Sequence, residues 1–339
     1  MIKDAIALLI DGKNLSEDEM IGAMRDIMEG KSTDAQIASF LTALRIKGET
    51  VEEITGAARV MREKVAKINA PEYTVDTCGT GGDMSHTFNI STTSALVVAA
   101  CGLPVAKHGN RSVSSSCGSA DVLETLGIKI DLEPSKVEEC LKTTGFGFMF
   151  APLFHPAMKY AIGPRKELGI RTVFNILGPL TNPAGAGRQV LGVFSDKLTE
   201  PMAEVLDNLG TKHAFVVHGE DGLDEITTTD KTRISELKEG KVKTYSISPE
   251  EFGLKRASRE DLVGGNAEEN AKITVNILEG EKGPKRDIVL LNAAAALIAG
   301  NRCNDFSEGL KKAAEALDSG AAREKLEEVR KASIELYRR

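Results

Sequence analysis

The fold class is decided by the stretch Tyr73-Thr74-Val75-Asp76-Thr77-Cys78-Gly79-Thr80-Gly81-Gly82-Asp83. Its first five residues predict a β-strand, and the glycines that follow predict a loop in which the backbone turns tightly. Before this stretch the sequence predicts helices only, and after it short strand patterns alternate with helical patterns. Such alternation is typical of an α/β domain with a largely parallel central sheet.

The expected elements downstream follow from short apolar runs and from helical periodicity. We expect strands at 105–107, 146–150, 190–194 and 214–218, and helices at 120–126, 136–143, 199–209 and 268–278. The segment 241–245 alternates as the edge of a hairpin does, and the tail 287–339 is helical and rich in alanine.

The first 70 residues predict a small all-helical unit. In a capping box, a hydroxyl and a Glu or Gln three residues later satisfy the free N–H groups of a helix start. Glycine is typical of helix ends, and a one-sided apolar stripe is typical of a packed helix. The capping pairs are Ser16 with Glu19, Thr33 with Gln36 and Thr50 with Glu53; Gly30 and Gly48 mark ends, and the stripe is Ile37, Phe40, Leu41 and Leu44.

A second helical stretch at 155–171 interrupts the later alternation, and Gly178-Pro179 and Asn182-Pro183 turns follow it. We therefore expect 1–70 and about 156–188 to form a small helical domain. The larger α/β domain is expected to comprise 71–155 and about 189–339, with a hinge between the two domains. An apolar face of the helical unit would suit either a partner subunit or the chain's own larger domain.

Composition narrows the classes of protein. The 339 residues suggest about two domains at ~150 residues each. A net charge of −7 and only 4% aromatic residues argue against a general nucleic-acid binder. No basic leader and no long apolar run occurs, so we expect a cytoplasmic protein with neither nucleic acid nor membrane as partner. Five cysteines without a C-x-x-C pair indicate free thiols: Cys78, Cys101, Cys117, Cys140 and Cys303.

The glycine loop 79–83 is the first candidate site. Its backbone N–H groups can approach an anion closely. It does not match a phosphate-binding P-loop, which needs a following Lys-Ser/Thr, or a dinucleotide fingerprint, because Met84 stands where glycine is required. Taken alone, the loop is equally typical of an ordinary tight turn.

Two further loops strengthen the anion-binding interpretation. The segment Asn89-Ile90-Ser91-Thr92-Thr93 precedes an apolar run and predicts free N–H groups at a helix start, which suits phosphate or an ordinary polar cap. The segments Lys107–Ser112 and Ser114–Ser119 surround Gly109 with cations and hydroxyls. Such a concentration of donors favours an anion site over a solvated loop.

The pair Asp224-Glu225 follows an expected strand and a glycine turn. Adjacent carboxylates suit Mg²⁺, which prefers oxygen ligands, although acidic surface loops are common. Beside three anion loops, a metal that neutralises a polyphosphate becomes the sensible interpretation. Arg165 could bind a carboxylate through two parallel N–H donors, although taken alone it is more typical of a surface arginine. The residues together indicate a Mg²⁺-assisted enzyme for a phosphorylated small molecule.

The ordered motifs resemble the anthranilate phosphoribosyltransferase family over nearly the whole chain, with no departure at a motif position. The matching segments are Asp76–Asp83, Thr87–Thr92, Lys107–Arg111, Gly118–Glu124, Asn175–Pro183 and Asp224-Glu225. The resemblance implies a small helical domain beside a larger α/β domain, and a homodimer formed through the small domain. It also implies transfer of phosphoribose from phosphoribosyl pyrophosphate to the amine of anthranilate, with Mg²⁺, in tryptophan biosynthesis.

The resemblance also implies roles for individual residues. Phosphoribosyl pyrophosphate would bind Gly79, Thr80, Gly81, Gly82, Asp83, Thr87, Asn89, Ser91, Thr92, Lys107 and Ser119. Mg²⁺ would bind Ser91, Asp224 and Glu225. Anthranilate would bind Gly79, His108, Asn110, Arg165, His155 and Gly178. No discrete acid/base pair is expected, because an aromatic amine is already neutral near pH 7 and displacement through an oxocarbenium-like state relies on electrostatic stabilisation.

Three alternatives remain open from the sequence. The first is a pyrimidine nucleoside phosphorylase of the same fold, which the segments Lys107–Asn110 and Asn175–Pro183 disfavour. The second is a non-catalytic nucleic-acid-binding paralogue, which the charge and the low aromatic content disfavour. A serine hydrolase is the third, but Ser114–Ser116 lacks a nucleophile elbow.

Overall fold

The computed structural model describes residues 1–82, 85–112 and 116–339. The strands in these ranges form one seven-stranded sheet in the order β3-β2-β1-β4-β5-β6-β7. The five strands β1 to β5 run parallel, and β6 and β7 add an antiparallel hairpin at one edge. The bounds are β1 Val75–Gly79, β2 Val105–Gly109, β3 Phe146–Phe150, β4 Arg188–Gly192, β5 His213–Gly219, β6 Thr232–Lys238 and β7 Lys241–Ile247.

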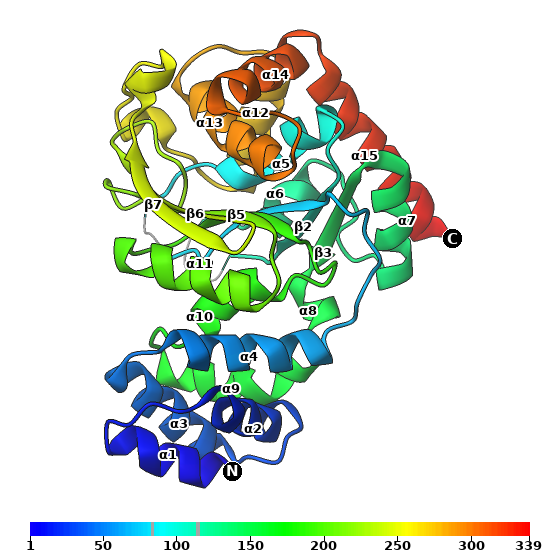
Figure 1. Ribbon diagram of the computed structural model, residues 1–339. Helices are drawn as coiled ribbons and strands as arrows, with labels where there is room; N and C mark the ends of the chain where they lie inside the picture. Colours follow the sequence, from blue (N-terminus) through cyan, green and yellow to red (C-terminus); the bar gives the residue numbers. More distant parts are fainter. Residues whose placement is uncertain (83–84, 113–115) are drawn as a thin grey trace.

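Helices cover both faces of the sheet (Figure 1). Above it in that view lie α5 and the late helices α12 to α15, whereas α11 and the N-terminal helices lie below. The helices of the α/β part are α5 Ile90–Ala100, α6 Ser119–Thr125, α7 Pro134–Thr144, α8 Ala151–Phe154, α11 Thr199–Asn208, α12 Ala267–Leu278, α13 Pro284–Ala299, α14 Phe306–Asp318 and α15 Ala321–Arg338.

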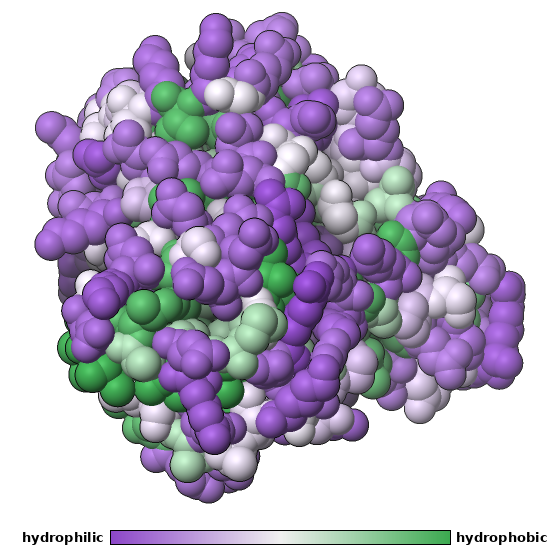
Figure 2. All heavy atoms as spheres, turned by 60° about the horizontal axis from the view of Figure 1, so that its bottom comes forward, coloured by the Kyte–Doolittle hydropathy of each residue, from purple (hydrophilic) through white to green (hydrophobic). Residues whose placement is uncertain are grey.

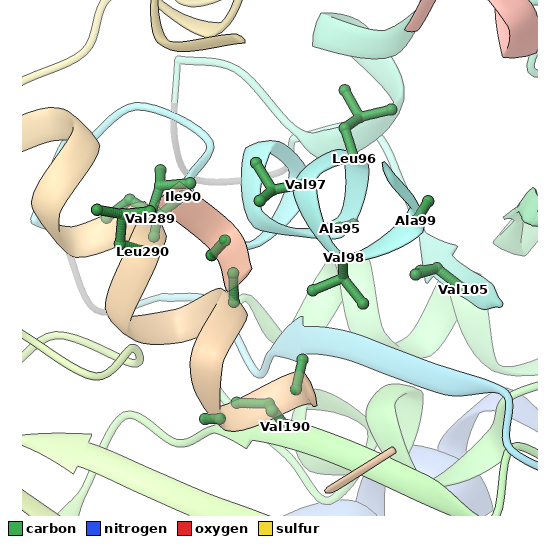
Figure 3. Packing of buried hydrophobic residues seen from close by; sticks show 14 of the residues in the cluster. Ile90, Ala95, Leu96, Val97, Val98, Ala99, Val105, Val190, Val289 and Leu290 are labelled. Atoms are coloured by element: carbon green, nitrogen blue, oxygen red, sulfur yellow. The ribbon is translucent and has the colours of Figure 1, made fainter. Parts of the chain in front are cut away.

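The main core lies between the upper face of the sheet and α5 with α13. Every residue of α5 from Thr92 to Ala99 is buried, because this helix is enclosed by the sheet and by α13, α14 and α15. Figure 3 shows its apolar side chains beside Val289 and Leu290 of α13, over the strands that carry Val105 and Val190. The buried α5 therefore holds its N-terminus in a fixed place beside the end of β1.

The N-terminal helices form a bundle at the lower end of Figure 1. These are α1 Ile2–Ile10, α2 Glu17–Met28, α3 Asp34–Lys47 and α4 Val51–Lys64; α9 Lys159–Leu168 contacts α2 and α3, and α10 Phe174–Leu177 contacts α4. All three predicted capping boxes are present. The four residues of the predicted stripe are buried, and Gly30 and Gly48 have the positive φ expected at helix ends.

The bundle and the sheet share one apolar core. Leu191, Val193 and Val216 of the lower sheet face belong to the same buried cluster as the N-terminal helices. The guanidinium of Arg62 on α4 also donates to the carbonyls of Leu180 (2.6 Å) and Leu209 (3.0 Å). Burial of this side chain lowers its pKa to about 10.

The predicted fold class, a small helical domain with a larger α/β domain and a largely parallel sheet, is confirmed. Element bounds differ by a few residues. The helix expected over 155–171 is divided into a 3₁₀ turn, Pro156–Met158, and α9, which ends at Leu168 because Gly169 adopts the left-handed conformation. Across the described residues, no helix is both long enough and apolar enough to span a membrane.

Candidate functional site

The candidate site lies where the strand order reverses. From β1 the chain continues outward through β2 and β3 on one side, and through β4 and β5 on the other. Ligands of open α/β sheets bind at such a switch point, beyond the carboxyl ends of the strands. The last residues of the two central strands, Gly79 and Gly192, are direct neighbours in the parallel register.

Both of these glycines are in close contact with Asp224. A Cβ on Gly79 would lie 2.3 Å from Oδ2 of Asp224, and a Cβ on Gly192 would lie 1.5 Å from its carbonyl oxygen. Neither position can therefore hold a side chain without moving the acidic loop. Sequence reasoning singled out Gly79 but missed Gly192, whose only local signal is a glycine at the end of a strand.

Two of the three predicted anion loops contact the acidic pair. The N–H of Gly81 donates to Oδ2 of Asp224 (2.7 Å), and the N–H of Ser91, in the first turn of α5, donates to Oε1 of Glu225 (3.1 Å). Residues separated by more than 130 positions in the chain thus form one site. Its backbone donors are the N–H groups that favour negative charge.

The donor chemistry of this site suits Mg²⁺. In residues 1–82, 85–112 and 116–339, no group of three or more His, Cys, Asp or Glu side chains lies in a metal-binding arrangement. The set formed by Asp224, Glu225 and the Ser91 hydroxyl contains only oxygen. A set of two carboxylates and one hydroxyl fits an ion that keeps several water ligands, and it does not fit zinc.

Lys107 places a positive charge beneath the site. Its side chain is 1% exposed, and its Nζ donates to the carbonyl of Thr77 (2.5 Å) and to Oγ of Ser91 (3.4 Å). Burial lowers the pKa of this amine, while the charges of Asp76 and Glu225 act in the opposite direction. Lys107 therefore supports the anion site from within the core, not from a solvent-exposed position.

Asp76 balances that charge and fixes the next loop. Its carboxylate accepts from the N–H of His108 (3.3 Å) and from Nδ2 of Asn182 (2.7 Å). Burial raises the pKa of Asp76, and Lys107 and the two hydrogen bonds counteract this shift. Sequence reasoning gave no role to Asp76 or Asn182, although both stand inside the quoted motifs.

The other predicted phosphoribosyl residues line the same end of the sheet. Oγ1 of Thr80 accepts from the N–H of Phe194 (3.2 Å), and Nδ2 of Asn89 donates to the carbonyl of Cys117 (3.2 Å). Thr87 forms an isolated bridge with Val263, and Oγ of Ser119 donates to the carbonyl of Asn110 (3.3 Å). These contacts hold the loops around the predicted phosphate site.

Two predicted phosphoribosyl residues differ from the others. The side chain of Thr92 is buried in α5, and its hydroxyl has no hydrogen-bond partner among the described residues. Asp83 lies outside the described residues, as do Ser114 and Ser115 of the third loop.

Arg171 is a residue that sequence reasoning missed. Its Nη2 donates to the carbonyl of Gly82, and its guanidinium lies 4.4 Å from the ring centroid of Phe194. The arginine thus connects the chain after α9 to the glycine loop. It stands at the end of the helix expected over 155–171, where nothing in the local sequence signals the contact.

Two predicted acceptor residues form a buried imidazole pair. Nε2 of His108 lies 3.2 Å from Nε2 of His155, and Nδ1 of His108 lies 3.2 Å from the carbonyl oxygen of Gly178. Burial lowers the pKa of His108 to about 3, with a further contribution from His155, and burial lowers the pKa of His155 to about 4. Both rings are therefore neutral near pH 7.

Arg165 lies at the other end of α10 from Gly178. Its guanidinium is 5.1 Å from the ring centroid of Phe174, the first residue of that helix, and burial lowers its pKa. Burial is the one cause of this shift, and within the described part of the chain the guanidinium has no ion-pair or hydrogen-bond partner. Asn110 is exposed at the end of β2, and its Oδ1 accepts from the N–H of Arg111 (2.8 Å).

Most of the chain matches one family of known proteins. Residues 72–323 match the family described as "Glycosyl transferase family, a/b domain", and residues 3–65 match its "helical bundle domain". The chain is 62% identical to the anthranilate phosphoribosyltransferase of Acetivibrio thermocellus, over 97% of this chain and 95% of that protein.

Solved structures lead to the same family. The anthranilate phosphoribosyltransferase of Thermus thermophilus is similar with a TM-score of 0.93 and 46% identity, over 98% of this chain and 99% of that one. The enzyme of Saccharomyces cerevisiae, solved in complex with PRPP (phosphoribosyl pyrophosphate) and Mg, is similar with a TM-score of 0.89 and 30% identity, over 98% of both chains.

Proposed function

The chain belongs to the anthranilate phosphoribosyltransferase family, and from that premise we propose how its residues divide the work of the family's reaction. The enzyme transfers the phosphoribosyl group of phosphoribosyl pyrophosphate to the amine of anthranilate in tryptophan biosynthesis. The single observation that carries the assignment of residues is the meeting of Gly81, Ser91, Asp224 and Glu225 at the switch point.

We assign the diphosphate end of phosphoribosyl pyrophosphate to the place where the glycine loop and the start of α5 contact Asp224 and Glu225. The buried amine of Lys107 behind Ser91 supplies positive charge. The N–H groups of Gly81 and Ser91 donate to Asp224 and Glu225 in this structure, and they would pass to the diphosphate when the two carboxylates hold Mg²⁺. Asp224, Glu225 and Ser91 would hold Mg²⁺, which when bound neutralises the charge of the leaving pyrophosphate. Further donor contacts are proposed for Gly79, Thr80, Gly82, Asp83, Thr87, Asn89, Thr92 and Ser119.

The acceptor substrate belongs between α10 and the end of β2. The half-buried guanidinium of Arg165 suits the carboxylate of anthranilate, because a fork of N–H donors matches two carboxylate oxygens. The buried pair of His108 and His155, beside Gly178, provides a neutral wall. We further propose that Gly79 and Asn110 lie between this acceptor site and the bound phosphoribosyl pyrophosphate.

The chemistry that follows is a displacement at the anomeric carbon of ribose. The positive charge of Lys107 and the N–H groups of the glycine loop and of the first turn of α5 stabilise the charge that develops on the departing pyrophosphate. Holding both substrates in one site supplies the proximity effect. The turnover test has two arms: phosphoribosylanthranilate formed with equimolar pyrophosphate supports the proposal, whereas phosphate-dependent release of base from a pyrimidine nucleoside supports a phosphorylase instead.

We also propose that residues 1–70 and about 156–188 act as one domain that closes on the remainder of the chain. The contacts of α9 with α2 and α3 support this division. Closure predicts a smaller radius of gyration in solution scattering when both substrates are present. Equal radii with and without substrates would contradict it.

A homodimer through the helical bundle is the further part of the proposal. Figure 2 shows hydrophobic side chains gathered toward the lower left of the face that carries the bundle. Exposed apolar residues of α1, α3 and α9 and of the turn after α9 support it: Ile10, Ile46, Ile162 and Ile170. Light scattering should give twice the 36.3 kDa of one chain. Ile10→Lys with Ile46→Lys should give a monomer, and Tyr337→Lys, an exposed site elsewhere, should not.

A further inference from the structure

The hydrogen-bond chain through His108 and His155 has a direction. The oxygen of Gly178 is a carbonyl and can only accept, so Nδ1 of His108 must carry the proton of the 3.2 Å contact. His108 is neutral, so its Nε2 is then an unprotonated acceptor. The 3.2 Å contact between the two Nε2 atoms therefore requires the proton on Nε2 of His155. One backbone carbonyl fixes the tautomers of both rings.

With this direction, Nδ1 of His155 is the one nitrogen of the pair that has no hydrogen-bond partner within the described residues. Both nitrogens of His108 are used inside the protein, so its ring can offer the substrate only its face and edge. Nδ1 of His155 carries a lone pair and makes no hydrogen bond within the described residues. It is also not among the fully buried polar atoms that lack a partner, so part of its surface is accessible. The pair thus presents a single acceptor, on His155.

The surroundings distinguish the two ends of an aminobenzoate. The carbonyl of Gly178 and the ring of Phe174 are separated by one turn of α10, about 6 Å along the helix axis. Arg165, at the Phe174 end, offers only donors and a positive charge. His155, at the Gly178 end, offers only an acceptor. A carboxylate suits the first and an N–H group suits the second.

Resting on the proposed function, we propose that Nδ1 of His155 accepts the hydrogen bond and then the proton of the substrate amine, and that His108 is a positioning residue for it. In this step the amine nitrogen forms a bond to the anomeric carbon, while the bond from that carbon to the pyrophosphate oxygen breaks. The electron pair of the broken bond leaves with pyrophosphate. The proton of the new ammonium moves to Nδ1 of His155.

A weak base is sufficient for this transfer. The ammonium formed on an aromatic amine is itself strongly acidic once the nitrogen has bonded to carbon. His155 remains neutral until that moment, so it accepts a hydrogen bond from the incoming amine and does not repel the cationic transition state. Lys107 and Asp76, which adjoin His108, keep their own buried partners and do not supply this acceptor.

The first test needs no substitution in the protein that is measured. In the full chain labelled with ¹⁵N-histidine at neutral pH, long-range ¹H–¹⁵N correlation should show His108 with its proton on Nδ1 and His155 with its proton on Nε2. Adding anthranilate alone should shift Nδ1 of His155 more than any other histidine nitrogen. A proton on Nδ1 of His155, or a charged ring at either position, would overturn the proposal. His108→Gln and His155→Gln serve only to assign the signals.

The second test distinguishes proton acceptance by Nδ1 of His155 from a purely structural role of His155 as a donor to His108. His155→Gln keeps an N–H that can reach His108 but lacks the ring acceptor, and His155→Phe lacks both. Both variants should lose about 100-fold in kcat with KM for phosphoribosyl pyrophosphate unchanged. Recovery of wild-type kcat in the glutamine variant alone would overturn the proposal, because the donated N–H would then be sufficient. His213→Gln, a buried histidine paired with Glu236 on the far part of the sheet, is the matched control.

Failure of this inference is distinct from failure of the proposed function. A wild-type chain that does not consume anthranilate contradicts the function, whatever the tautomers. A wild-type chain that turns over anthranilate with the opposite tautomers contradicts only the role of His155.

Discussion

Gly192 and Asp224 are in direct backbone contact, and a Cβ on Gly192 would lie 1.5 Å from the carbonyl oxygen of Asp224. The strand that ends at Gly192 therefore determines how deeply the acidic loop enters the site. Gly79, its neighbour in the register, leaves room for the carboxylate of the same aspartate. Because both strands end in glycine, the buried carboxylate of Asp224 can reach the glycine loop.

Gly192→Ala should displace Asp224 and lower both stability and metal response. Overpacking against backbone costs about 1 to 3 kcal/mol in unfolding free energy. We expect that loss in chemical denaturation, together with a rise in the Mg²⁺ concentration needed for half-maximal rate. Gly187→Ala is the control, because a Cβ there would meet nothing closer than 4.0 Å. Equal stability and equal Mg²⁺ response of the two variants would refute the role of the contact.

Asp224→Asn combined with Glu225→Gln should lower turnover at fixed Mg²⁺. The amides keep the size of the side chains but remove the two charges that would hold the metal. We expect the Mg²⁺ dependence of the steady-state rate to move to higher concentration. The paired control is Asp230→Asn with Glu250→Gln, whose parent carboxylates bind Arg256 at the surface. A Mg²⁺ dependence identical to that of the wild type would rule out the acidic pair as metal ligands.

Arg165→Ala should weaken anthranilate binding more than phosphoribosyl pyrophosphate binding. The guanidinium is half-buried beside Phe174 and has no ion-pair partner in the described residues, so its removal breaks no internal bridge. We expect KM for anthranilate to rise at least tenfold, which corresponds to about 1.4 kcal/mol. Lys166→Ala, the exposed neighbour on α9, should leave both KM values unchanged. Equal losses for the two substrates would remove Arg165 from the acceptor site.

The buried histidines should make stability fall in mild acid. Burial lowers the pKa of His108 to about 3 and that of His155 to about 4, from an ordinary value of 6.5. The unfolded chain therefore binds protons that the folded chain does not, so stability is full above pH 6.5 and is lost progressively toward pH 4. Between about pH 7 and about pH 5 each ring contributes a loss of up to about 2 kcal/mol.

Denaturant titrations at these two pH values test that expectation. The double variant His108→Gln with His155→Gln should show a smaller loss of unfolding free energy than the wild type over the same interval. An unchanged difference would mean that other groups control the acid limb of stability.

Local features of the fold could be predicted because their causes are local. The capping boxes at Ser16, Thr33 and Thr50 place both partners within four residues, so their geometry follows from spacing alone. The glycine loop after β1 and the helix start at Asn89 are likewise local patterns. Their encounter with Asp224 and Glu225 is not, because it depends on how β4 and β5 lie beside β1.

The residues that sequence reasoning missed act at long range. Gly192 matters only through a residue 32 positions later, and Arg171 matters only through the carbonyl of Gly82. The side chain of Lys107 is buried, and its charge is compensated by Asp76, which is buried as well. The sequence can indicate which loops carry chemistry, but the contacts that set charge and position come from tertiary packing.

The measurement that tests the central claim most directly is an omission series. Purified protein is mixed with Mg²⁺, phosphoribosyl pyrophosphate and anthranilate, and the loss of anthranilate fluorescence is followed, with each component left out in turn. We predict steady loss in the complete mixture and none when any one component is missing. Persistent fluorescence in the complete mixture, with protein shown to be folded, would contradict the assignment of the chain as a phosphoribosyltransferase.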